Sequence, residues 1–388
     1  LAHWPTGPLA HRPTGPPALP LHLSGMRSPL RTVTLKLHLF LGLTAGLVVM
    51  VVCLTGAVLA FEADLLKLFA PERYHVEGSG VRVPVAQAFE AARATLPEAT
   101  LGGITVYQHA NRPWEFNFGQ GGRVHVDPFT GRVIESGVKR PVFFSKAQEL
   151  HRWLLAPNVG RPIVGAATVM FVFILLFGFI LWWPRTAGAF KVRINPFSLF
   201  TKHSSGRRKL HDLHVALGVW CLVPLLVMAL TGLPEGYQWA TKLLYVVTSS
   251  EQQPPAPTST SDSTLAAIAP DSALAVGVAL LGDAKQWSLR MPQRPTGAIS
   301  VVSLPLDGWH DRVVDQVYLD RVTGAQLRLD RWNDLSSGFR ARRSIYPWHF
   351  GTIWGFPSKL VAFLACLFGA SFPITGFLMY RAGKRTRS

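Results

Sequence analysis

Cysteine is scarce in this sequence, and the few cysteines are placed where they cannot cross-link the loops. The chain has 388 residues and 3 cysteines. Cys53, Cys221 and Cys366 each lie inside a long apolar run, so the long polar loops between those runs have no disulfides. A G-x-G-x-x-G dinucleotide fingerprint is also missing after every predicted strand, which argues against a built-in nicotinamide or flavin site.

Acidic residues are few as well, and the resulting charge has to be judged by where it falls. Lysine and arginine number 39 against 22 acidic residues, which gives a formal net charge of +17. The excess lies in short connections, with three basic and no acidic residues in 27–36, seven against one in 184–212, and four against none in 381–388. The long loops 67–150 and 249–348 are nearly balanced, with 10 basic and 8 acidic residues in the first and 10 of each in the second. This distribution indicates membrane topology and no nucleic-acid partner.

Four stretches of the sequence contain no charged side chain at all. They run over 39–61, 162–183, 215–234 and 360–380, and each has 20 to 23 residues. Because a helix rises about 1.5 Å per residue, about 20 residues cross a hydrocarbon core of roughly 30 Å. The sequence therefore predicts four transmembrane helices, since too little amphipathic sequence remains to bury four such runs in a soluble core.

The basic connections also predict the orientation of the chain. Short loops rich in lysine and arginine stay on the cytoplasmic side. We therefore expect a multi-pass protein of the bacterial inner (plasma) membrane, surrounded by membrane lipid, with both termini cytoplasmic and two large loops in the periplasm. Residues 1–25 are rich in proline and glycine and lack the apolar core of a signal peptide, so the first span is expected to act as an uncleaved signal.

The predicted fold class is a membrane protein with four transmembrane α-helices and two exported α+β domains, arranged as a duplicated half. The expected segments, in chain order, are a disordered N-terminal segment (1–29), transmembrane helix 1 (30–66), a first exported domain (67–150), transmembrane helix 2 (151–184), a basic cytoplasmic loop (185–209), transmembrane helix 3 (210–248), a linker and second exported domain (249–345), transmembrane helix 4 (346–381) and a cytoplasmic tail (382–388).

The duplication is predicted from short motifs that recur in register. L-H-x-x-L-G begins both the first and the third span, at 37–42 and 213–218. Near the ends of the same spans, the Thr-Gly pair at 55–56 recurs at 231–232, again 176 positions later. A D-x-x-T-G turn also occurs once in each long loop. Self-similarity of this kind indicates repeated structural units.

Each long loop has the pattern of a helix packed on a short sheet. In the first loop, helical spacing over 83–96 precedes three alternating runs at 104–108, 114–118 and 124–126. In the second loop, a linker rich in proline, serine and threonine precedes the predicted strands 286–291, 299–304, 313–319 and 325–329.

Histidines flank the apolar runs in two sets. His38, His211 and His214 lie at the predicted cytoplasmic ends of the spans, whereas His151 and His349 lie at the exported ends. Ionisable residues at membrane depth are costly and are functional candidates by default. A single histidine of this kind is more often an interfacial residue bonded to headgroups or backbone, but the matched placement favours a shared role. Three histidines of the loops are interpreted as surface residues: His109, His125 and His310.

A pair of histidines on facing helices can bind one planar metal cofactor from both sides. Gly42 and Gly218 lie one turn inside the membrane from His38 and His214, where a missing side chain leaves room for a porphyrin. No C-x-x-C-H motif is present, so any haem is held by side-chain ligands alone. The sequence thus predicts that His38 with His214, and His151 with His349, are the iron ligands of a planar metal cofactor such as haem.

Two alternatives concern the ligands themselves. His211 and His214 are three residues apart on one helix face, so His211 can replace His214 as the ligand or donate to a haem propionate. We favour His214 because it is the repeat mate of His38. Zinc is the competing metal, but a zinc site usually has four ligands with cysteine or carboxylate among them, and the cysteines lie in mid-span.

Arginines gather just before the fourth span. Arg340, Arg342 and Arg343 fit a solvated charge run, and they also fit a cradle for haem propionates or for an anionic substrate. Arg343 is the member that we single out as a cofactor-binding candidate.

The order of these motifs resembles a known family. His151-Arg152-Trp153 precedes a Gly-Arg-Pro span that ends in L-W-W-P-R, L-H-D-L-H follows at 210–214, and a last span follows His349. Over about residues 30–385, the sequence resembles the PepSY-associated transmembrane proteins, and within them it is similar to iron-regulated ferric-siderophore (ferrioxamine) reductases. The resemblance implies two PepSY-like exported domains, two b-type haems and electron delivery across the membrane to a ferric siderophore.

The expected function is therefore that of a di-haem oxidoreductase, with His151 and His349 nearest the substrate. The electron donor is expected to be a cytoplasmic or quinol donor that the sequence does not name. A regulatory PepSY membrane protein that binds a partner and has no redox cofactor is the alternative from another class. A transporter is a third hypothesis, weakened by parallel repeats and by the lack of charged mid-span residues.

Overall fold

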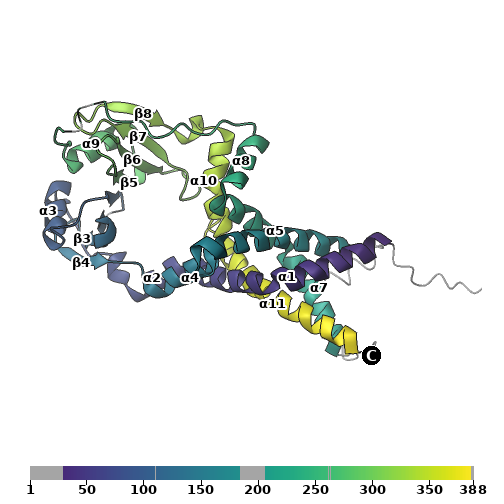
Figure 1. The fold of residues 1–388 in the computed structure, drawn as a ribbon. Helices are drawn as coiled ribbons and strands as arrows, with labels where there is room; N and C mark the ends of the chain where they lie inside the picture. Colours follow the sequence, from purple (N-terminus) through teal and green to yellow (C-terminus); the bar gives the residue numbers. More distant parts are fainter. Residues whose placement is uncertain (1–28, 110, 184–205, 261, 263, 386–388) are drawn as a thin grey trace, which may run out of the picture.

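The computed structural model describes residues 29–109, 111–183, 206–260, 262 and 264–385. The predicted disordered N-terminal segment and most of the basic loop 185–209 lie outside the described residues. Two regions are distinct in Figure 1: a bundle of long helices, and a β-sheet with its own helices that stands away from one end of the bundle.

All four predicted spans are helical. They correspond to α1 (Pro29–Ala60), α5 (Pro157–Trp182), α7 (Gly206–Gly236) and α11 (Phe356–Arg385). Each is long and apolar enough to cross a membrane, with a mean hydropathy between 2.0 and 2.7 over its most apolar window. Large apolar side chains such as Phe40, Leu47 and Val223 are exposed on the outside of the bundle, as on a surface that faces lipid.

The four long helices pack as a bundle with a small-residue centre. α1 and α7 each pack against both α5 and α11, so α1 and α7 occupy opposite corners. The buried centre consists mainly of alanine, cysteine, valine and leucine, and it includes Cys53 and Cys221. Cys366 is buried as well. Small side chains allow the helix backbones to approach closely, which is the main source of helix association in lipid.

Short helices connect the bundle to the β-sheet region. They are α2 (Glu62–Phe69), η1 (Pro71–Arg73), α4 (Val142–Trp153), α8 (Gln238–Val247) and α10 (Ser337–His349). α4 ends where Leu154 and Leu155 adopt positive φ values of 51° and 61°, and the chain then turns into α5. α10 likewise ends before a turn with Gly351 and Gly355 at φ 69°, and α11 follows. His151 and His349 therefore belong to short helices that precede the spans.

The two long loops together form one continuous antiparallel sheet of eight strands. Its order is β4-β3-β2-β1-β5-β6-β7-β8, with the first four strands from the first loop and the last four from the second. The bounds are β1 Gly103–Tyr107, β2 Trp114–Asn117, β3 Arg123–Val126, β4 Val133–Val138, β5 Ala284–Arg290, β6 Ile299–Pro305, β7 Asp315–Leu319 and β8 Gln326–Asp330. Seven of these strands and the helix of the first loop are as predicted. β4 and the helix of the second loop were not predicted.

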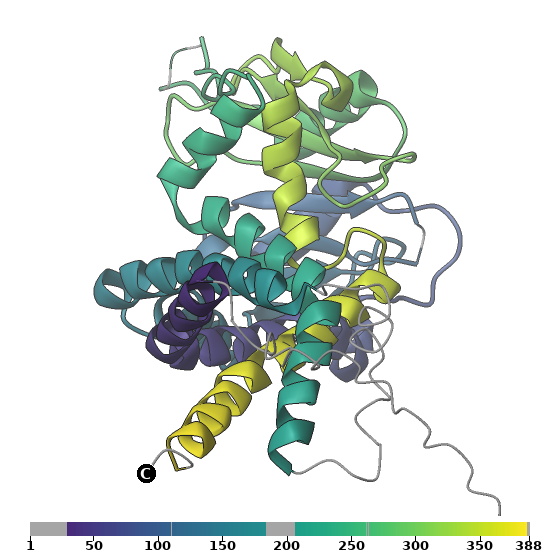
Figure 2. The same cartoon turned by 90° about the vertical axis from the view of Figure 1, so that its right-hand side faces the viewer.

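The two loops meet through their inner strands. β1 pairs with β5 over five residues, from Gly103 opposite Arg290 to Tyr107 opposite Gln286. Helices α3 (Val85–Thr95) and α9 (Pro270–Leu281), with the short turns η2 (Gly119–Gly121) and η4 (Trp332–Asp334), complete the region. α3 and α9 cover one face of the sheet and form a single apolar core with it. The other face is turned toward the bundle, and α10 rises from the bundle in front of the sheet (Figure 2).

Candidate cofactor site: two histidine pairs

The inner histidine pair is formed by His38 of α1 and His214 of α7. Their ring centres are 6.4 Å apart and the ring planes are nearly perpendicular, at 87°. Nδ1 of His38 lies 3.0 Å from the carbonyl oxygen of Ile174 in α5. Nδ1 of His214 lies 2.7 Å from the hydroxyl of Thr375 in α11. Residues of all four long helices thus hold the two rings.

The outer pair is formed by His151 of α4 and His349 of α10. Their ring centres are 6.2 Å apart, with an interplanar angle of 69°. Nδ1 of His151 lies 2.9 Å from the carbonyl oxygen of Val52 and 3.1 Å from the hydroxyl of Thr55. His349 repeats this arrangement on α7, where its Nδ1 lies 2.9 Å from the carbonyl oxygen of Met228 and 3.2 Å from the hydroxyl of Thr231.

These contacts decide which ring nitrogen is free to bind a metal. A carbonyl oxygen only accepts hydrogen bonds, so Nδ1 of His38, His151 and His349 carries the proton and donates it. The hydroxyl of Thr375 donates to backbone carbonyls of its own helix, so it accepts from His214. In every case Nε2 keeps its lone pair. Metal-binding histidines are oriented in this way by a bond from the other nitrogen.

The separation of the rings fits two imidazoles on one metal ion. A metal–nitrogen bond of about 2.0 Å on each side, with each ring centre about 1.1 Å behind its nitrogen, places the two centres roughly 6 Å apart. The observed values are 6.4 Å and 6.2 Å. Each pair would therefore suit one metal ion, such as the iron of a haem, held by a histidine from either side. Among the described residues there is no group of three or more His, Cys, Asp or Glu side chains that could hold a metal ion.

The distance between the pairs follows from α1. Val52 holds His151 and lies 14 positions after His38 on the same helix. At about 1.5 Å per residue, the two levels are about 20 Å apart. The pairs thus lie toward opposite ends of the bundle.

Glycines adjoin both pairs in two different ways. A β-carbon added at Gly42 or Gly218 would meet nothing within 4 Å, so there is open space beside the inner histidines. At the outer pair, a β-carbon at Gly56 would lie 3.2 Å from Cε1 of His151, and one at Gly232 would lie 3.0 Å from Cε1 of His349. The repeated Thr-Gly pairs are visible in the sequence, but their contacts with the outer histidines were not predicted.

His211 does not join the inner pair. Its side chain is 62 % exposed and its Nδ1 lies 3.1 Å from Asp212. The structure therefore places His214, and not His211, opposite His38.

The arginines before the fourth span reach different partners. Arg342 forms an ion pair with Glu235 at 2.5 Å. Arg343 donates instead to the side chain of Gln316 on β7, at 3.2 Å. Burial lowers the pKa of Arg343, and the nearby positive charge of Arg290 lowers it further.

Two loop histidines predicted to be at the surface are buried. His125 is 5 % exposed and His310 is 6 % exposed, whereas His109 is exposed as expected. His125 lies in β3, and His310 packs between Trp309 and Trp332 beneath α10. The surface interpretation was wrong for these two because the pairing of the strands and the docking of α10, which cover them, are not visible in local sequence.

Comparison with known protein families agrees with this architecture. The model of the PepSY-associated TM region matches residues 35–382. The chain belongs to this family of membrane proteins. No curated protein matches the chain.

Proposed function

We propose that the two histidine pairs hold two b-type haems and that the protein carries electrons across the membrane to reduce a ferric siderophore on the exported side. The observation that carries this proposal is the matched geometry of the pairs, with ring centres 6.4 Å and 6.2 Å apart at opposite ends of one bundle. For an enzyme that acts on one face of the membrane, a single pair is enough. Two pairs at different depths suit transfer between the two membrane faces.

The chain's own residues supply ligation and insulation. Bound haem iron would accept and release one electron at a time. Backbone carbonyls of Ile174, Val52 and Met228 hold the rings in one tautomer, with Nε2 available for the iron. The hard oxygen ligands of a siderophore bind ferrous iron less tightly than ferric iron, so reduction of the bound iron releases it.

A duplicated half is the origin that we propose for this arrangement. Val52 and Met228, which hold the outer histidines, are 176 positions apart, as are Thr55 and Thr231. His151 and His349 are 198 positions apart. The same spacing relates Gly178 and Gly376, which adjoin the inner histidines. Two constant offsets are expected if one half was copied and later gained residues in its exported loop.

A spectrum and a reoxidation assay test the function together. Purified protein is expected to show a b-type haem spectrum with about two haems per chain. After reduction, mixing with a ferric siderophore is expected to reoxidise the haem, with ferrous iron trapped by a chromogenic chelator. A colourless protein, or haem that reoxidises no faster with ferric siderophores than with buffer, would favour the regulatory alternative.

The orientation is tested separately. We propose that both termini are cytoplasmic and both long loops periplasmic, because the short connections carry the basic residues. Reporter fusions at Gln120 and Asp283 are expected to be active on the periplasmic side, and fusions at Ser198 and at the C-terminus on the cytoplasmic side. A cytoplasmic signal at Gln120 would reverse the direction of electron flow in this proposal.

A further inference from the structure

The face of the exported sheet that α3 and α9 leave uncovered is polar and is turned toward the bundle (Figure 2). Along each strand, alternate residues enter the apolar core beneath α3 and α9, and the others point to the opposite face. One transverse row on that face crosses all eight strands and has few apolar members: Glu135, His125, Glu115, Thr105, Ser288, Val302, Gln316 and Asp330.

Three arginines gather at the second-loop end of this face. Arg290 is the last residue of β5 and is exposed. Arg312 lies two residues after His310, in the loop before β7. Arg343 reaches the face from α10 through its bond to Gln316. Arg312 lies 4.0 Å over the ring of Tyr346, and Arg343 lies 5.0 Å over the ring of Phe339. The positive charges of Arg290 and Arg312 both lower the pKa of Arg343, as expected for cations that share one place.

Two of these arginines, Arg290 and Arg343, lack the carboxylate partners that other arginines in the exported region have. Elsewhere ion pairs join Arg73 to Glu135, Arg140 to Glu62, Arg328 to Asp330, Arg331 to Asp315 and Arg342 to Glu235. Among the described residues, neither Arg290 nor Arg343 has a carboxylate oxygen within 4.0 Å, and Arg312 has one contact, at 3.8 Å with the neighbouring Asp311. The excess positive charge is therefore available to a ligand.

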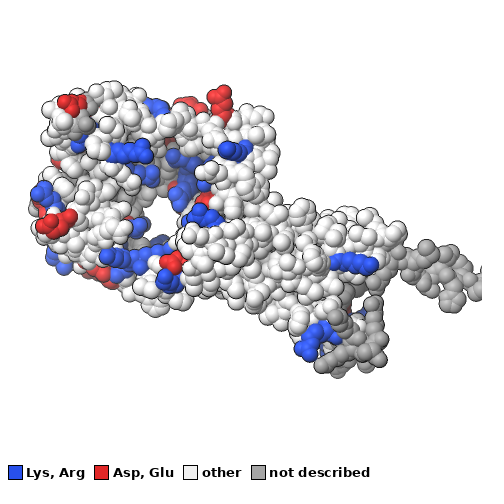
Figure 3. Space-filling model, in the orientation of Figure 1, with Lys and Arg blue, Asp and Glu red and all other residues white. Residues whose placement is uncertain are grey.

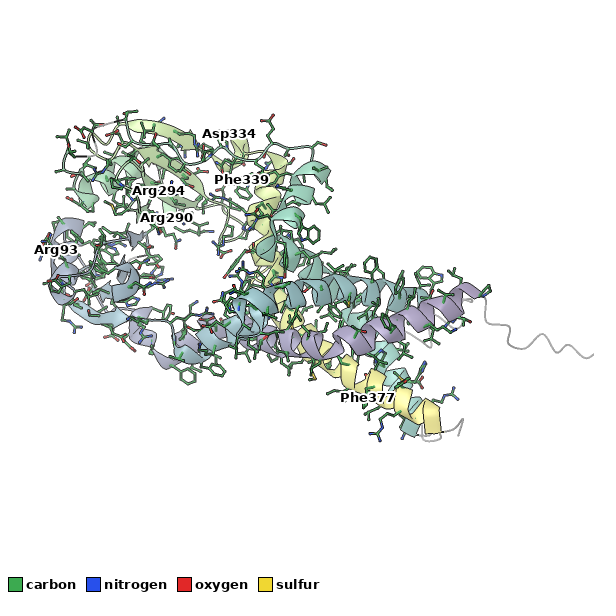
Figure 4. All side chains as sticks on the ribbon, in the orientation of Figure 1. Arg93, Arg290, Arg294, Asp334, Phe339 and Phe377 are labelled. Carbon is green, nitrogen blue, oxygen red and sulfur yellow. The ribbon has the colours of Figure 1, made fainter. Side chains whose placement is uncertain are left out.

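Arg290, one member of this cluster, borders an opening between the sheet and the bundle. Figure 3 shows a hollow between the sheet and the bundle-side helices, with Lys and Arg atoms around its rim. Arg290 lies on the sheet side of that hollow, and Phe339 lies on α10 (Figure 4). Arg343 precedes His349 by six residues on α10, a distance of about 9 Å along the helix.

We propose that this opening binds ferric chelates of net negative charge, with Arg290, Arg312 and Arg343 as the residues that select them over neutral or cationic complexes. Guanidinium groups on aromatic rings suit planar oxygen-rich anions, such as catecholates and carboxylates around ferric iron. This places Arg343 at the substrate and not at a haem propionate. Reduction of the bound chelate rests on the proposed electron transfer, whereas binding of the chelate does not.

Gallium complexes test the binding without electron transfer. Ga³⁺ takes the oxygen ligands of Fe³⁺ and is not reduced under these conditions. Calorimetric titration of the full-length protein in zwitterionic nanodiscs is expected to show at least about tenfold tighter binding of the trianionic gallium tris-catecholate than of a neutral gallium tris-hydroxamate. The preference is expected to weaken as salt is raised.

Charge-neutral variants locate the effect. Arg343→Gln and Arg290→Gln are each expected to weaken tris-catecholate binding about tenfold, with an unchanged haem spectrum. Arg343→Lys, which keeps the charge, is expected to retain part of the affinity. Arg93→Gln is the matched control, because Arg93 lies on α3, on the covered side of the sheet (Figure 4), and is exposed.

Several outcomes would overturn this assignment. One is that the neutral gallium complex binds as tightly as the tris-catecholate, and another is that Arg93→Gln weakens tris-catecholate binding as much as Arg343→Gln does. A third is that Arg343→Gln loses haem. The last is that anionic lipid in the nanodisc abolishes chelate binding, which would assign the cluster to lipid headgroups. Failure of the electron-transfer proposal is recognised independently, since it appears as missing haem or absent reoxidation while gallium binding persists.

Discussion

The inner and outer histidine pairs have nearly the same ring separation but are supported differently. Both outer rings are held by a backbone carbonyl together with a threonine hydroxyl, in the same way in each half. The inner pair is mixed, with a carbonyl for His38 and only a hydroxyl for His214. A carbonyl cannot donate, whereas a hydroxyl can rotate. The comparison teaches that the inner site depends on one side chain more than the outer site does.

Removing an outer ligand is expected to have the largest effect. His349→Ala or His151→Ala should release the outer haem, because non-covalent haem is retained mainly by its axial ligands and the fit of the surrounding pocket. The haem-to-protein ratio should fall to about half, and ferric siderophore reduction should fall to background while the inner haem stays reducible. A full haem complement in either variant would show that this pair is not a ligand pair.

Variants at the inner pair are expected to show which of two neighbouring histidines, His211 or His214, is the ligand. His214→Ala should release the inner haem and spare the outer one, because only His214 faces His38. His211→Ala should keep both haems, since His211 is exposed and bonded to Asp212. The haem-to-protein ratio of the two variants decides between them. The opposite result would make His211 the ligand and leave the relay in place.

The difference in support predicts unequal effects of two matched threonine variants. Thr375→Val removes the only bond that the described residues make to Nδ1 of His214, and loss of such a partner typically costs about 10-fold to 100-fold in metal-site affinity. Thr231→Val should cost less, because the carbonyl of Met228 still holds His349. Rates of haem transfer to an excess of a haem-scavenging apoprotein measure both. Equal rates would mean that the carbonyl contributes nothing.

The smallest expected effect concerns the glycines behind the rings. A β-carbon at Gly232 would lie 3.0 Å from Cε1 of His349, so Gly232→Ala should displace the ring by a few tenths of an ångström and change the haem absorption spectrum. A β-carbon at Gly376 would lie 3.9 Å from Cε1 of His214, which is an ordinary contact. Gly376→Ala should leave the spectrum unchanged, and a larger change there than at Gly232 would contradict this geometry.

The sequence predicted those parts of the molecule that local pattern determines. Uncharged runs of 20 to 23 residues mark the spans because lipid imposes a length on them. Alternating runs mark seven of the strands because one sheet face is buried. β4 was missed because Gly137 interrupts it and its positions are only half-buried. α9 was missed because its sequence is apolar almost throughout and shows little periodicity.

The site was predicted only as far as repetition revealed it. His38 and His214 share a motif, and His151 and His349 share a position before a span. Their contacts with Val52 and Ile174 depend on how helices far apart in sequence pack, and a backbone carbonyl has no sequence signature. The role of Arg343 likewise depends on its contact with Gln316, across 27 positions of chain.

The pairing of β1 with β5 has a consequence for how the protein is made. Thr105 and Ser288 lie opposite each other, and their hydroxyl oxygens are 3.1 Å apart, yet 183 positions separate them in the chain. During synthesis the strands of the first long loop must wait, with the edge of β1 unpaired, until two further long apolar helices and then the strands of the second loop have been made. An unpaired edge invites wrong strand pairing, and contacts of such long sequence separation form slowly. Completion of the eight-stranded sheet is therefore the folding step at which wrong strand pairing is the greatest hazard.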